Sequence, residues 1–390
     1  MPHPFQFYRT PGIRFGDGAF DDVPGLAARF GSRALVITGG SSFRDSGNLT
    51  RLIDGLSRLN VTAEIANAPG EPSPKLVDST VAAFRHGGIE VVIAAGGGSS
   101  IDAGKAIAAM LPLRDSVMEY IEGIGGKKHP GTKTPFIAVP TTSGTGSEAT
   151  KNAVLSRVGP GGFKKSLRHD TFTPDVAVVD PSLALSCPVE VTAACGMDAL
   201  TQLIESYVSS KATPFTDSLG LFATDQVLKA IRSACSTGAG DIAVRSAMAY
   251  GSLVSGITLA NAGLGIVHGL ASPLGARFQI PHGSACGTLL AAAVRITIKK
   301  LRERGNLQAL KKYGQLGSLV DTNLAPEAPR ACDALVTELY RLTEDLRMPR
   351  LSSFGMSEND VETIAAQASN KNNPEPLEDA DIRNILAERL

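Results

Sequence analysis

Five short apolar runs, separated by helical patterns, determine what the first half of this chain can fold into. They are ALVITGG (34–40), VTAEIAN (61–67), VVIAAGGG (91–98), PFIAVPTT (135–142) and DVAVVD (175–180). Runs rich in Val, Ile and Ala and bounded by Gly or Pro are typical of strands buried on both faces. Between them, residues 48–59 and 75–88 carry apolar side chains at helical spacing. This alternation predicts an α/β fold, a parallel sheet with helices on both faces.

The second half of the chain has a different pattern. From about residue 182 to residue 390 the periodicity is helical throughout, with few clusters of β-branched residues. A chain of 390 residues also exceeds what one hydrophobic core usually serves. We therefore expect an α/β domain over residues 1–181 and an all-helical domain over residues 182–390. The opening segment 7–20 has hairpin-like turn signals and is expected to form an edge element.

Residues 246–276 contain no Asp, Glu, Lys or Arg, and the stretch is long enough to span a bilayer. It also contains six Gly, four Ser, Asn261, His268 and Pro273, which is too polar for lipid-facing helices. A helical hairpin buried in protein is the favoured interpretation, and no membrane partner is expected. His268 would then lie in enclosed surroundings.

The overall composition excludes several classes of function. Lys plus Arg and Asp plus Glu both number 38, so the chain lacks the basic excess that nucleic acids or anionic membranes attract. Trp is absent, which disfavours base-stacking surfaces. The five Cys are widely spaced with no CxxC, which indicates neither a disulfide framework nor a zinc ribbon. With no signal-peptide pattern at the start, we expect a cytoplasmic protein.

The segment IAAGGGSSIDAGKAIAAM (93–110) carries the clearest local motif. A strand runs into three glycines, and a helix is expected to begin near Ser99 or Ser100. Glycines let a phosphate approach the backbone, and the helix start offers unpaired N–H groups. The P-loop pattern fails because Ser99 and Ala106 stand where it needs Gly and Ser or Thr, and GxGxxG lacks its third glycine. Phosphate binding is favoured over a plain tight turn.

A second loop with the same character strengthens that interpretation. VPTTSGTGSEAT (139–150) follows another predicted strand and combines glycines with hydroxyl groups. Thr141, Thr142, Thr145 and Ser147 can donate hydrogen bonds to ribose and phosphate oxygens. Loops that follow strands of one parallel sheet meet at the edge where α/β proteins bind ligands. The two loops together predict a nucleotide cofactor.

Three residues of the helical half suggest a metal site. Asp198, His268 and His282 all lie among apolar or small residues. A lone histidine in such a place is more often a satisfied core residue, but buried Asp and His together are costly unless paired or metal-bound. One carboxylate and two imidazoles suit zinc or ferrous iron. The remaining histidines, in polar and presumed exposed stretches, receive no role: His3, His86, His129 and His169.

Four motifs, in order, resemble the iron-containing (group III) alcohol dehydrogenases, relatives of glycerol dehydrogenase and dehydroquinate synthase. They are GGGSSIDAGK, PTTSGTGSE, GMDALTQLIESYVS and GIVHGLASPLGARFQIPHG, and the similarity runs across nearly the whole chain. The resemblance implies a dehydroquinate synthase-like fold with a dinucleotide-binding domain and a helical metal and substrate domain. It also implies hydride transfer between NAD or NADP and a small alcohol or carbonyl compound, with Fe²⁺ or Zn²⁺ polarising the substrate oxygen.

The resemblance also implies roles for individual residues. The pyrophosphate loop would consist of Gly97, Gly98, Ser99 and Asp102, with further cofactor contacts from Thr141, Thr142 and Lys164. Asp198, His268 and His282 match three of the family's four metal ligands, and Gln202 replaces the usual histidine at the fourth. Gln202 shares a helix face with Asp198, but an amide oxygen is a poorer ligand than imidazole. A weakened metal site is therefore predicted.

Two further departures leave alternatives open. Ser272 stands where many family members have another histidine, and Gly39 stands where many NAD-preferring members have Asp. Without an acid at residue 39, NADP is not excluded. The first alternative function is a metal-independent reductase like maleylacetate reductase, with His268 or His282 as general acid. The second is nucleotide binding without net redox turnover. A homodimer is expected because it is the commonest symmetric oligomer.

Overall fold

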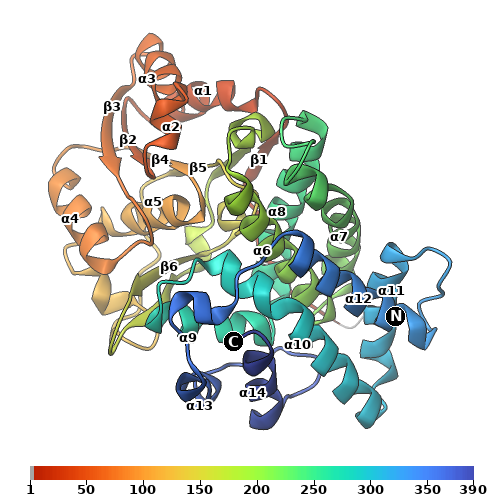
Figure 1. The fold of residues 1–390 in the computed structure, drawn as a ribbon. Helices are drawn as coiled ribbons and strands as arrows, with labels where there is room; N and C mark the ends of the chain where they lie inside the picture. The colour runs from red at the N-terminus through yellow and green to blue at the C-terminus, as the bar shows by residue number, and fades with distance from the viewer. Residues whose placement is uncertain (1–3) are drawn as a thin grey trace. The chain divides into compact units, whose positions relative to one another are not determined.

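The computed structural model describes residues 4–390, and the chain divides into two compact units. One unit holds Tyr8–Arg157 and Gly162–Cys187. The other holds Pro188–Leu390, together with Val158–Gly161 and a short stretch near the N-terminus. Figure 1 shows the first unit in red to yellow-green and the helices of the second in green to blue.

The first unit is built on a six-stranded parallel sheet in the order β1-β8-β5-β4-β2-β3. All five predicted strands are present, which confirms the α/β fold. The strands are β1 (Gly12–Phe15), β2 (Arg33–Thr38), β3 (Thr62–Asn67), β4 (Val91–Gly96), β5 (Phe136–Pro140) and β8 (Val176–Val179). Because β4 and β5 are neighbours and parallel, the loops that follow them leave from the same edge of the sheet.

Helices cover both faces of this sheet, which explains why its inner strands β2, β4 and β5 are apolar at nearly every position. Along β2, Leu35 and Ile37 face a core shared with α4 (Pro74–Phe84) and α5 (Gly98–Met110). Ala34 and Val36 face the opposite core, shared with α1 (Val23–Ala28) and α3 (Asn48–Arg58). A strand buried on both sides cannot alternate apolar and polar residues.

One local expectation about this unit is wrong, and one pair of strands was missed. The opening segment forms an edge strand, but β1 pairs in parallel with β8 and makes no hairpin. Its turn residues lead instead into a 3₁₀ turn at Ala19–Asp22, where the Asp180 carboxylate accepts a hydrogen bond from the Phe20 N–H at 3.0 Å. The antiparallel pair β6 (Asn152–Arg157) and β7 (Phe163–Arg168) was not predicted. Helix α5 begins at Gly98, slightly earlier than expected.

The second unit is helical, as predicted. Its helices are α6 (Val189–Val208), α7 (Pro214–Ala234), α8 (Ile242–Ala262), α9 (Ile266–Arg277), α10 (His282–Arg304), α11 (Leu307–Val320), α12 (Pro329–Asp345), α13 (Glu358–Ala366) and α14 (Asp379–Glu388). One apolar core runs through them, with members from α6 to α14.

The uncharged stretch 246–276 falls in α8 and α9, two helices joined by a short turn. By length and composition α8 could cross a membrane, with a mean hydropathy of 1.3. However, 61% of that apolar window is buried inside the protein. Core helices of large proteins pass the same test, so the stretch is explained by burial against its helical neighbours.

Two glycines let α10 approach α6 closely. A Cβ atom added at Gly283 would lie 2.3 Å from the Ala194 carbonyl oxygen of α6. One added at Gly287, one turn later, would lie 2.7 Å from the Met197 Cβ. Since no side chain fits there, the absence of Cβ at both positions sets how near the two helix backbones come. These are the helices that carry Asp198 and His282.

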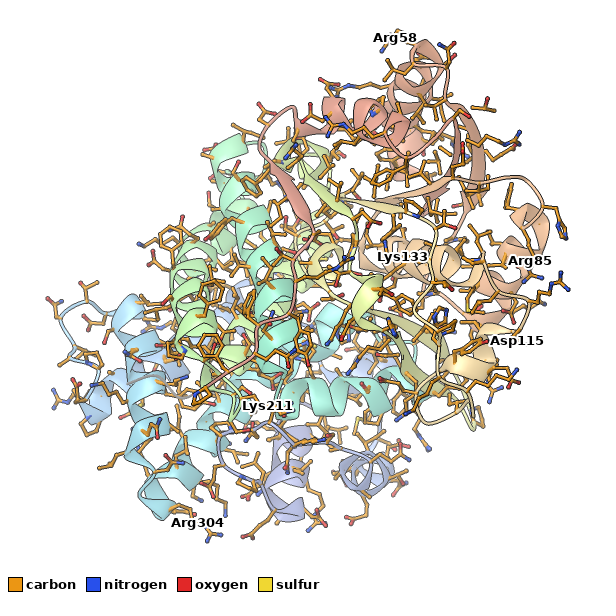
Figure 2. The ribbon with its side chains drawn as sticks, turned by 180° about the vertical axis from the view of Figure 1, so that it is seen from behind. Arg58, Arg85, Asp115, Lys133, Lys211 and Arg304 are labelled. Carbon is orange, nitrogen blue, oxygen red and sulfur yellow. The ribbon has the colours of Figure 1, made fainter. Side chains whose placement is uncertain are left out.

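Charged side chains mostly lie at the outside of each unit. Figure 2 shows this for Arg58 and Asp115 of the α/β unit and for Arg304 of the helical unit. Several charged side chains are nevertheless buried, among them Lys105, Glu148, Asp198, Glu205 and Arg245. Burying a charge is costly unless it is paired, so buried charged side chains are candidates for functional residues.

The expectation that the remaining histidines are exposed is wrong for His129. His129 is 8% exposed, its Nε2 lies 3.2 Å from the Ala109 carbonyl oxygen, and its ring packs edge-on against Phe172. The covering ring comes from far along the chain, so the polar residues beside His129 gave no sign of it. His86 is exposed as expected, and His3 lies outside the described residues.

Candidate functional site

Two loops of the α/β unit contact each other: the glycine loop after β4 (residues 96–99) and the hydroxyl loop after β5 (residues 141–150). The Thr141 N–H donates to the Gly96 carbonyl oxygen at 2.9 Å. A Cβ atom added at Gly98 would lie 2.4 Å from the Thr145 Oγ1, so only glycine permits this approach. Five of the predicted cofactor contacts, all partly exposed, gather here: Gly97, Gly98, Ser99, Thr141 and Thr142. Backbone N–H groups at the start of α5 and nearby hydroxyls suit the phosphates of a nucleotide.

Asp102, another predicted cofactor contact, faces the protein instead. Its carboxylate accepts hydrogen bonds from the Val154 N–H at 2.9 Å and from the Ser147 hydroxyl, and it lies 3.6 Å from the Lys105 Nζ. Burial raises the pKa of Asp102 despite the nearby lysine. Lys105 in turn donates to the Ser147 and Asn152 carbonyl oxygens at 2.8 and 2.7 Å. In this structure Asp102 ties the hydroxyl loop to α5.

Lys164 lies in β7 and is also paired within the protein. Its Nζ lies 2.8 Å from the Glu71 Oε2, and the side chain is mostly buried. A cofactor phosphate would therefore have to compete with the Glu71 carboxylate for this lysine.

Four potential metal ligands converge in the helical unit. Asp198 comes from α6, His268 from α9, and His282 and Cys286 from α10, and their ligand atoms all lie within 4.8 Å of one another. The Asp198 Oδ1 lies 3.3 Å from the His268 Nε2 and 3.7 Å from the His282 Nε2. The Cys286 Sγ lies 3.6 and 3.8 Å from the same two nitrogens.

The distances among these four groups are compatible with a divalent metal between them. Ordinary zinc–oxygen, zinc–nitrogen and zinc–sulfur bonds place tetrahedral ligand atoms about 3.3 Å apart for N–O pairs and about 3.6 Å apart for N–S pairs. In addition, the buried Asp198 Oδ1 accepts no hydrogen bond of acceptable geometry from residues 4–390. Two imidazole nitrogens form ion pairs with this oxygen but no well-aligned hydrogen bond, and a bound cation would satisfy it more fully.

Two residues of this region were missed from the sequence, Cys286 and Glu205. Cys286 stands one helical turn after His282, and Glu205 stands two turns after Asp198. Both therefore share a helix face with a predicted ligand, a signal that spacing alone could have given. They were overlooked because a cysteine in an apolar helix ordinarily serves as a core residue, and a glutamate as a surface one.

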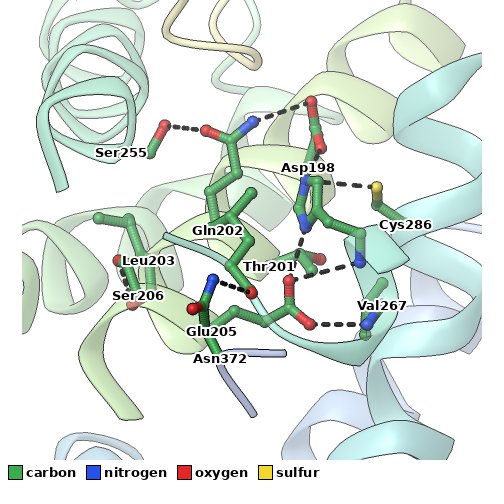
Figure 3. Close-up of polar contacts among 12 residues, drawn as sticks. Asp198, Thr201, Gln202, Leu203, Glu205, Ser206, Ser255, Val267, Cys286 and Asn372 are labelled. Carbon is green, nitrogen blue, oxygen red and sulfur yellow. Dashed lines mark hydrogen bonds and ion pairs between the residues drawn. The ribbon is translucent and has the colours of Figure 1, made fainter. Parts of the chain in front are cut away.

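Gln202 lies beside the four groups with its amide nitrogen turned toward them. The Nε2 donates to the Asp198 Oδ2 at 3.4 Å, and the Oε1 accepts from the Ser255 hydroxyl at 2.8 Å (Figure 3). In this arrangement the amide oxygen, the only atom of Gln202 that could bind a metal, is held by Ser255.

The Glu205 carboxylate fixes the ring of His268. Its Oε2 lies 2.7 Å from the His268 Nδ1, and its Oε1 accepts from the Val267 N–H at 2.7 Å at the start of α9. A proton on Nδ1 leaves Nε2 as the atom that faces Asp198 and Cys286. Carboxylates that hold a histidine in this way raise its quality as a metal ligand.

The titratable groups of the site shift one another's pKa values. Burial works against a charged Asp198, but His282 and His268 outweigh it and hold the pKa of that carboxyl below its ordinary value. Burial also opposes a charged His268, yet Cys286, Asp198 and Glu205 raise the pKa of this imidazole well above its usual range. Burial raises the pKa of the Cys286 thiol to about 12. A bound cation would displace these protons.

Glu205→Gln is expected to weaken metal binding by about 10–100-fold, the usual effect of changing a group that orients a metal-binding histidine. The amide keeps the size of the side chain but loses the charge that polarises the His268 ring. Dissociation constants for Zn²⁺, measured by competition with a chelating dye, would show the change.

Glu190→Gln serves as the matched control, because Glu190 lies on the same helix but is exposed. It should leave the dissociation constant unchanged. Equal affinities for the Glu205 variant and the wild type would show that the carboxylate does not support the site.

Comparisons with known proteins agree on one family over almost the whole chain. Residues 10–181 match the model described as iron-containing alcohol dehydrogenase, and residues 192–390 match the C-terminal model of the Fe-containing alcohol dehydrogenase family. Long-chain-alcohol dehydrogenase 1 of Geobacillus thermodenitrificans is 34% identical over 378 residues, 95% of this chain and 93% of its own length. NADPH-dependent butanol dehydrogenase of Clostridium saccharobutylicum is 30% identical, covering 96% and 95%.

A similar solved structure supports the same conclusion. The crystal structure of a 1,3-propanediol oxidoreductase aligns with a TM-score of 0.89 over the full length of both chains, at 28% sequence identity. Similarity of this extent includes both the parallel sheet and the helices that carry the four converging groups.

Proposed function

This chain belongs to the iron-containing alcohol dehydrogenase family, and we propose that it interconverts a small alcohol and the corresponding carbonyl compound by hydride transfer with NAD or NADP. The observation that carries the proposal is the convergence of Asp198, His268, His282 and Cys286 within 4.8 Å in the helical unit. The paired glycine and hydroxyl loops of the α/β unit supply the kind of surface that a dinucleotide needs.

The residues of the helical unit would have separate roles in binding the metal and in positioning its ligands. Asp198, His268 and His282 would hold the divalent metal, which when bound supplies a Lewis acid for the substrate oxygen. Glu205 keeps the His268 ring in place and its Nδ1 proton engaged. His282 is the more accessible of the two histidines, with 26% of its side chain exposed against 11% for His268. Substrate would therefore reach the site on the His282 side.

The metal-independent alternative, with His268 or His282 as a general acid, is not favoured. A general acid needs one ring positioned toward substrate, whereas here both Nε2 atoms point toward the same carboxylate and thiol. Nucleotide binding without redox turnover is disfavoured because the curated relatives are alcohol dehydrogenases.

The test is a panel of alcohols and aldehydes, from short to long chain, assayed by absorbance of the reduced nicotinamide. Each substrate is run with NADH or NADPH and with added Zn²⁺, added Fe²⁺ or a chelator. We expect turnover that the chelator abolishes and a metal restores. Full activity in the chelator, with no metal in the purified protein, would overturn the metal's role, and no turnover with any pair would overturn the reaction class.

We also propose that the chain accepts NADPH. The turn after β2 carries Gly39 rather than an acid, and a Cβ atom added there would lie 2.7 Å from the Ser100 Oγ at the start of α5. A carboxylate in that turn would hydrogen-bond the ribose hydroxyls of NAD and repel a 2′-phosphate. Its absence removes that repulsion.

Gly39→Asp is expected to lower kcat/KM for NADPH relative to NADH by about tenfold or more, which corresponds to about 1.4 kcal/mol of repulsion. Gly39→Ala is the matched control, because it adds the Cβ atom near Ser100 without the charge. Steady-state kinetics with both cofactors would distinguish the two effects. A ratio that falls equally in both variants would assign the change to crowding and not to charge.

The cellular location and the oligomeric state of the protein are the last part of the proposed function. We propose a cytoplasmic homodimer, supported by the absence of disulfides among residues 4–390 despite five cysteines and by the exposed edge strand β1. Sedimentation equilibrium at several concentrations would give the oligomeric state, and a monomer throughout would overturn the dimer.

A further inference from the structure

We propose that the Cys286 sulfur is the fourth protein ligand of the divalent metal, in the role that Gln202 does not fill, and that this donor set selects zinc over ferrous iron. The inference rests on the proposed function in one respect, that a divalent metal binds at Asp198, His268 and His282. It changes the prediction of a weakened site, because the number of protein ligands is restored by a different residue on a different helix.

The position of the Cys286 Sγ is the first support. The atom lies 3.6 Å from the His268 Nε2 and 3.8 Å from the His282 Nε2. Ligand atoms on one tetrahedral zinc are about 3.6 Å apart for sulfur and nitrogen. Cys286 follows His282 by one turn of α10, so both side chains leave the same helix face toward the Asp198 carboxylate.

The second support is independent of the cysteine. The Asp198 Oδ1 is buried and accepts no hydrogen bond of acceptable geometry from the described part of the chain. Gln202 does not relieve it, because the amide donates to the other oxygen, Oδ2, while its own oxygen is occupied by Ser255. An amide nitrogen has no lone pair to give a metal. In this arrangement the residue at the expected fourth position supports Asp198 and directs no lone pair toward the site.

The surroundings of Cys286 also differ from those of an ordinary core cysteine. Core cysteines act as small apolar side chains. The fully buried Cys286 instead directs its sulfur at two imidazole nitrogens beside a carboxylate. By contrast, the buried Cys332 of α12 donates a weak hydrogen bond to the Leu310 carbonyl oxygen at 3.4 Å.

Binding of a divalent metal to Cys286 releases protons and involves no redox change. The metal displaces the proton of the Cys286 S–H bond and the proton carried by the His268 Nε2 when that ring is charged, metal–sulfur and metal–nitrogen bonds form, and the displaced protons pass to solvent without any change of oxidation state. Asp198 and the thiolate then carry two negative charges against the two positive charges of the metal. Thiolate is a soft ligand that favours zinc. Imidazole and carboxylate bind both zinc and iron, so a site made of these groups alone would discriminate less between the two metals. The selectivity follows from this one exchange.

Cobalt(II) gives a direct test, because a cobalt–thiolate bond adds a near-ultraviolet charge-transfer band that nitrogen and oxygen ligands do not produce. The full-length protein is stripped of metal, titrated with CoCl₂ and followed by absorption. We expect a one-to-one complex with this band in the wild type and in Cys332→Ser. Cys286→Ser and Cys286→Ala should bind cobalt without the band.

Zinc affinity and metal choice provide the second readout. Zn²⁺ binding to the Cys286 variants should weaken by about 100-fold or more, beyond the ~10–100-fold typical of groups that only orient a ligand. Under anaerobic competition with equal Zn²⁺ and Fe²⁺, the preference for zinc should fall in the variants and not in Cys332→Ser. Circular dichroism would verify that each variant is folded.

The outcomes separate this inference from the proposed function. Cobalt binding by the wild type without the charge-transfer band would overturn the role of Cys286 and leave the metal site intact. No stoichiometric cobalt or zinc binding at all would overturn both. An unchanged zinc preference in the Cys286 variants, with the band lost, would overturn the selectivity alone.

Discussion

Asp198→Asn is expected to lower kcat/KM by about 10³-fold, the largest effect of any single change proposed for this chain. The Lewis acid is worth several kcal/mol of transition-state stabilisation, and about 4 kcal/mol corresponds to that factor. Asp198 is 1% exposed, and its Oδ1 lies closer to the Nε2 atoms of His268 and His282 than the Cys286 Sγ does, so an amide removes the negative charge at the centre of the site. Metal analysis of the purified variant should show less than stoichiometric metal.

Asp225→Asn is the matched control for this prediction. Asp225 lies on α7 in the same unit, and its carboxylate pairs with Lys229 at the surface at 2.7 Å. Surface pairs of this kind contribute little, so activity and metal content should match the wild type. Retention of both in Asp198→Asn would show that the carboxylate does not hold the metal.

Gly283→Ala should lower activity by about 10²-fold without removing any ligand. The added Cβ atom would meet the Ala194 carbonyl oxygen at 2.3 Å, and a backbone atom cannot rotate away. Helices α6 and α10 must then separate, which moves His282 and Cys286 relative to Asp198. Displacements of about 1 Å can reduce activity by this factor, and overpacking typically costs about 1–3 kcal/mol of stability. Kinetics and thermal denaturation would measure the two effects.

Gly220→Ala tests whether these losses are specific to the crossing of α6 and α10. Gly220 lies inside α7, and a Cβ atom there would approach nothing closer than 3.8 Å. Because Gly disfavours helix by roughly 1 kcal/mol relative to Ala, this change should stabilise the protein slightly and leave activity unaffected. If both variants behaved alike, the close helix approach would not be what positions the site.

Much of the fold could be predicted from the sequence because its determinants are local. The apolar strands β2, β4 and β5 are recognisable since residues on both faces are buried, and helical periodicity marks the second unit from α6 onward. The hairpin expected near Gly12 failed because its turn residues serve a 3₁₀ turn capped by Asp180, a partner far along the chain. The pair β6 and β7 is short and partly polar, so its pattern resembled loop.

The candidate site was predictable where a residue's chemistry conflicts with its surroundings. The sequence predicts a metal site at Asp198, His268 and His282 because charged or titratable groups are costly in apolar helices. Cys286 and Glu205 raise no such conflict in sequence, and only their contacts across helices show what they do. The orientation of Gln202 depends on Ser255, which lies on another helix and has no sequence pattern that links the two.

Helix α6 places three polar residues on one side, at Asp198, Gln202 and Glu205. Asp198 faces one ring nitrogen of His268 and Glu205 contacts the other. The two acidic residues lie seven positions apart on α6, a rise of about 10.5 Å along the helix axis. Because Asp198 and Glu205 both belong to α6, a different side chain at residue 202 does not change how they hold the His268 ring. Residue 202 can therefore differ from the histidine usual in the family while Asp198 and Glu205 still hold the His268 ring.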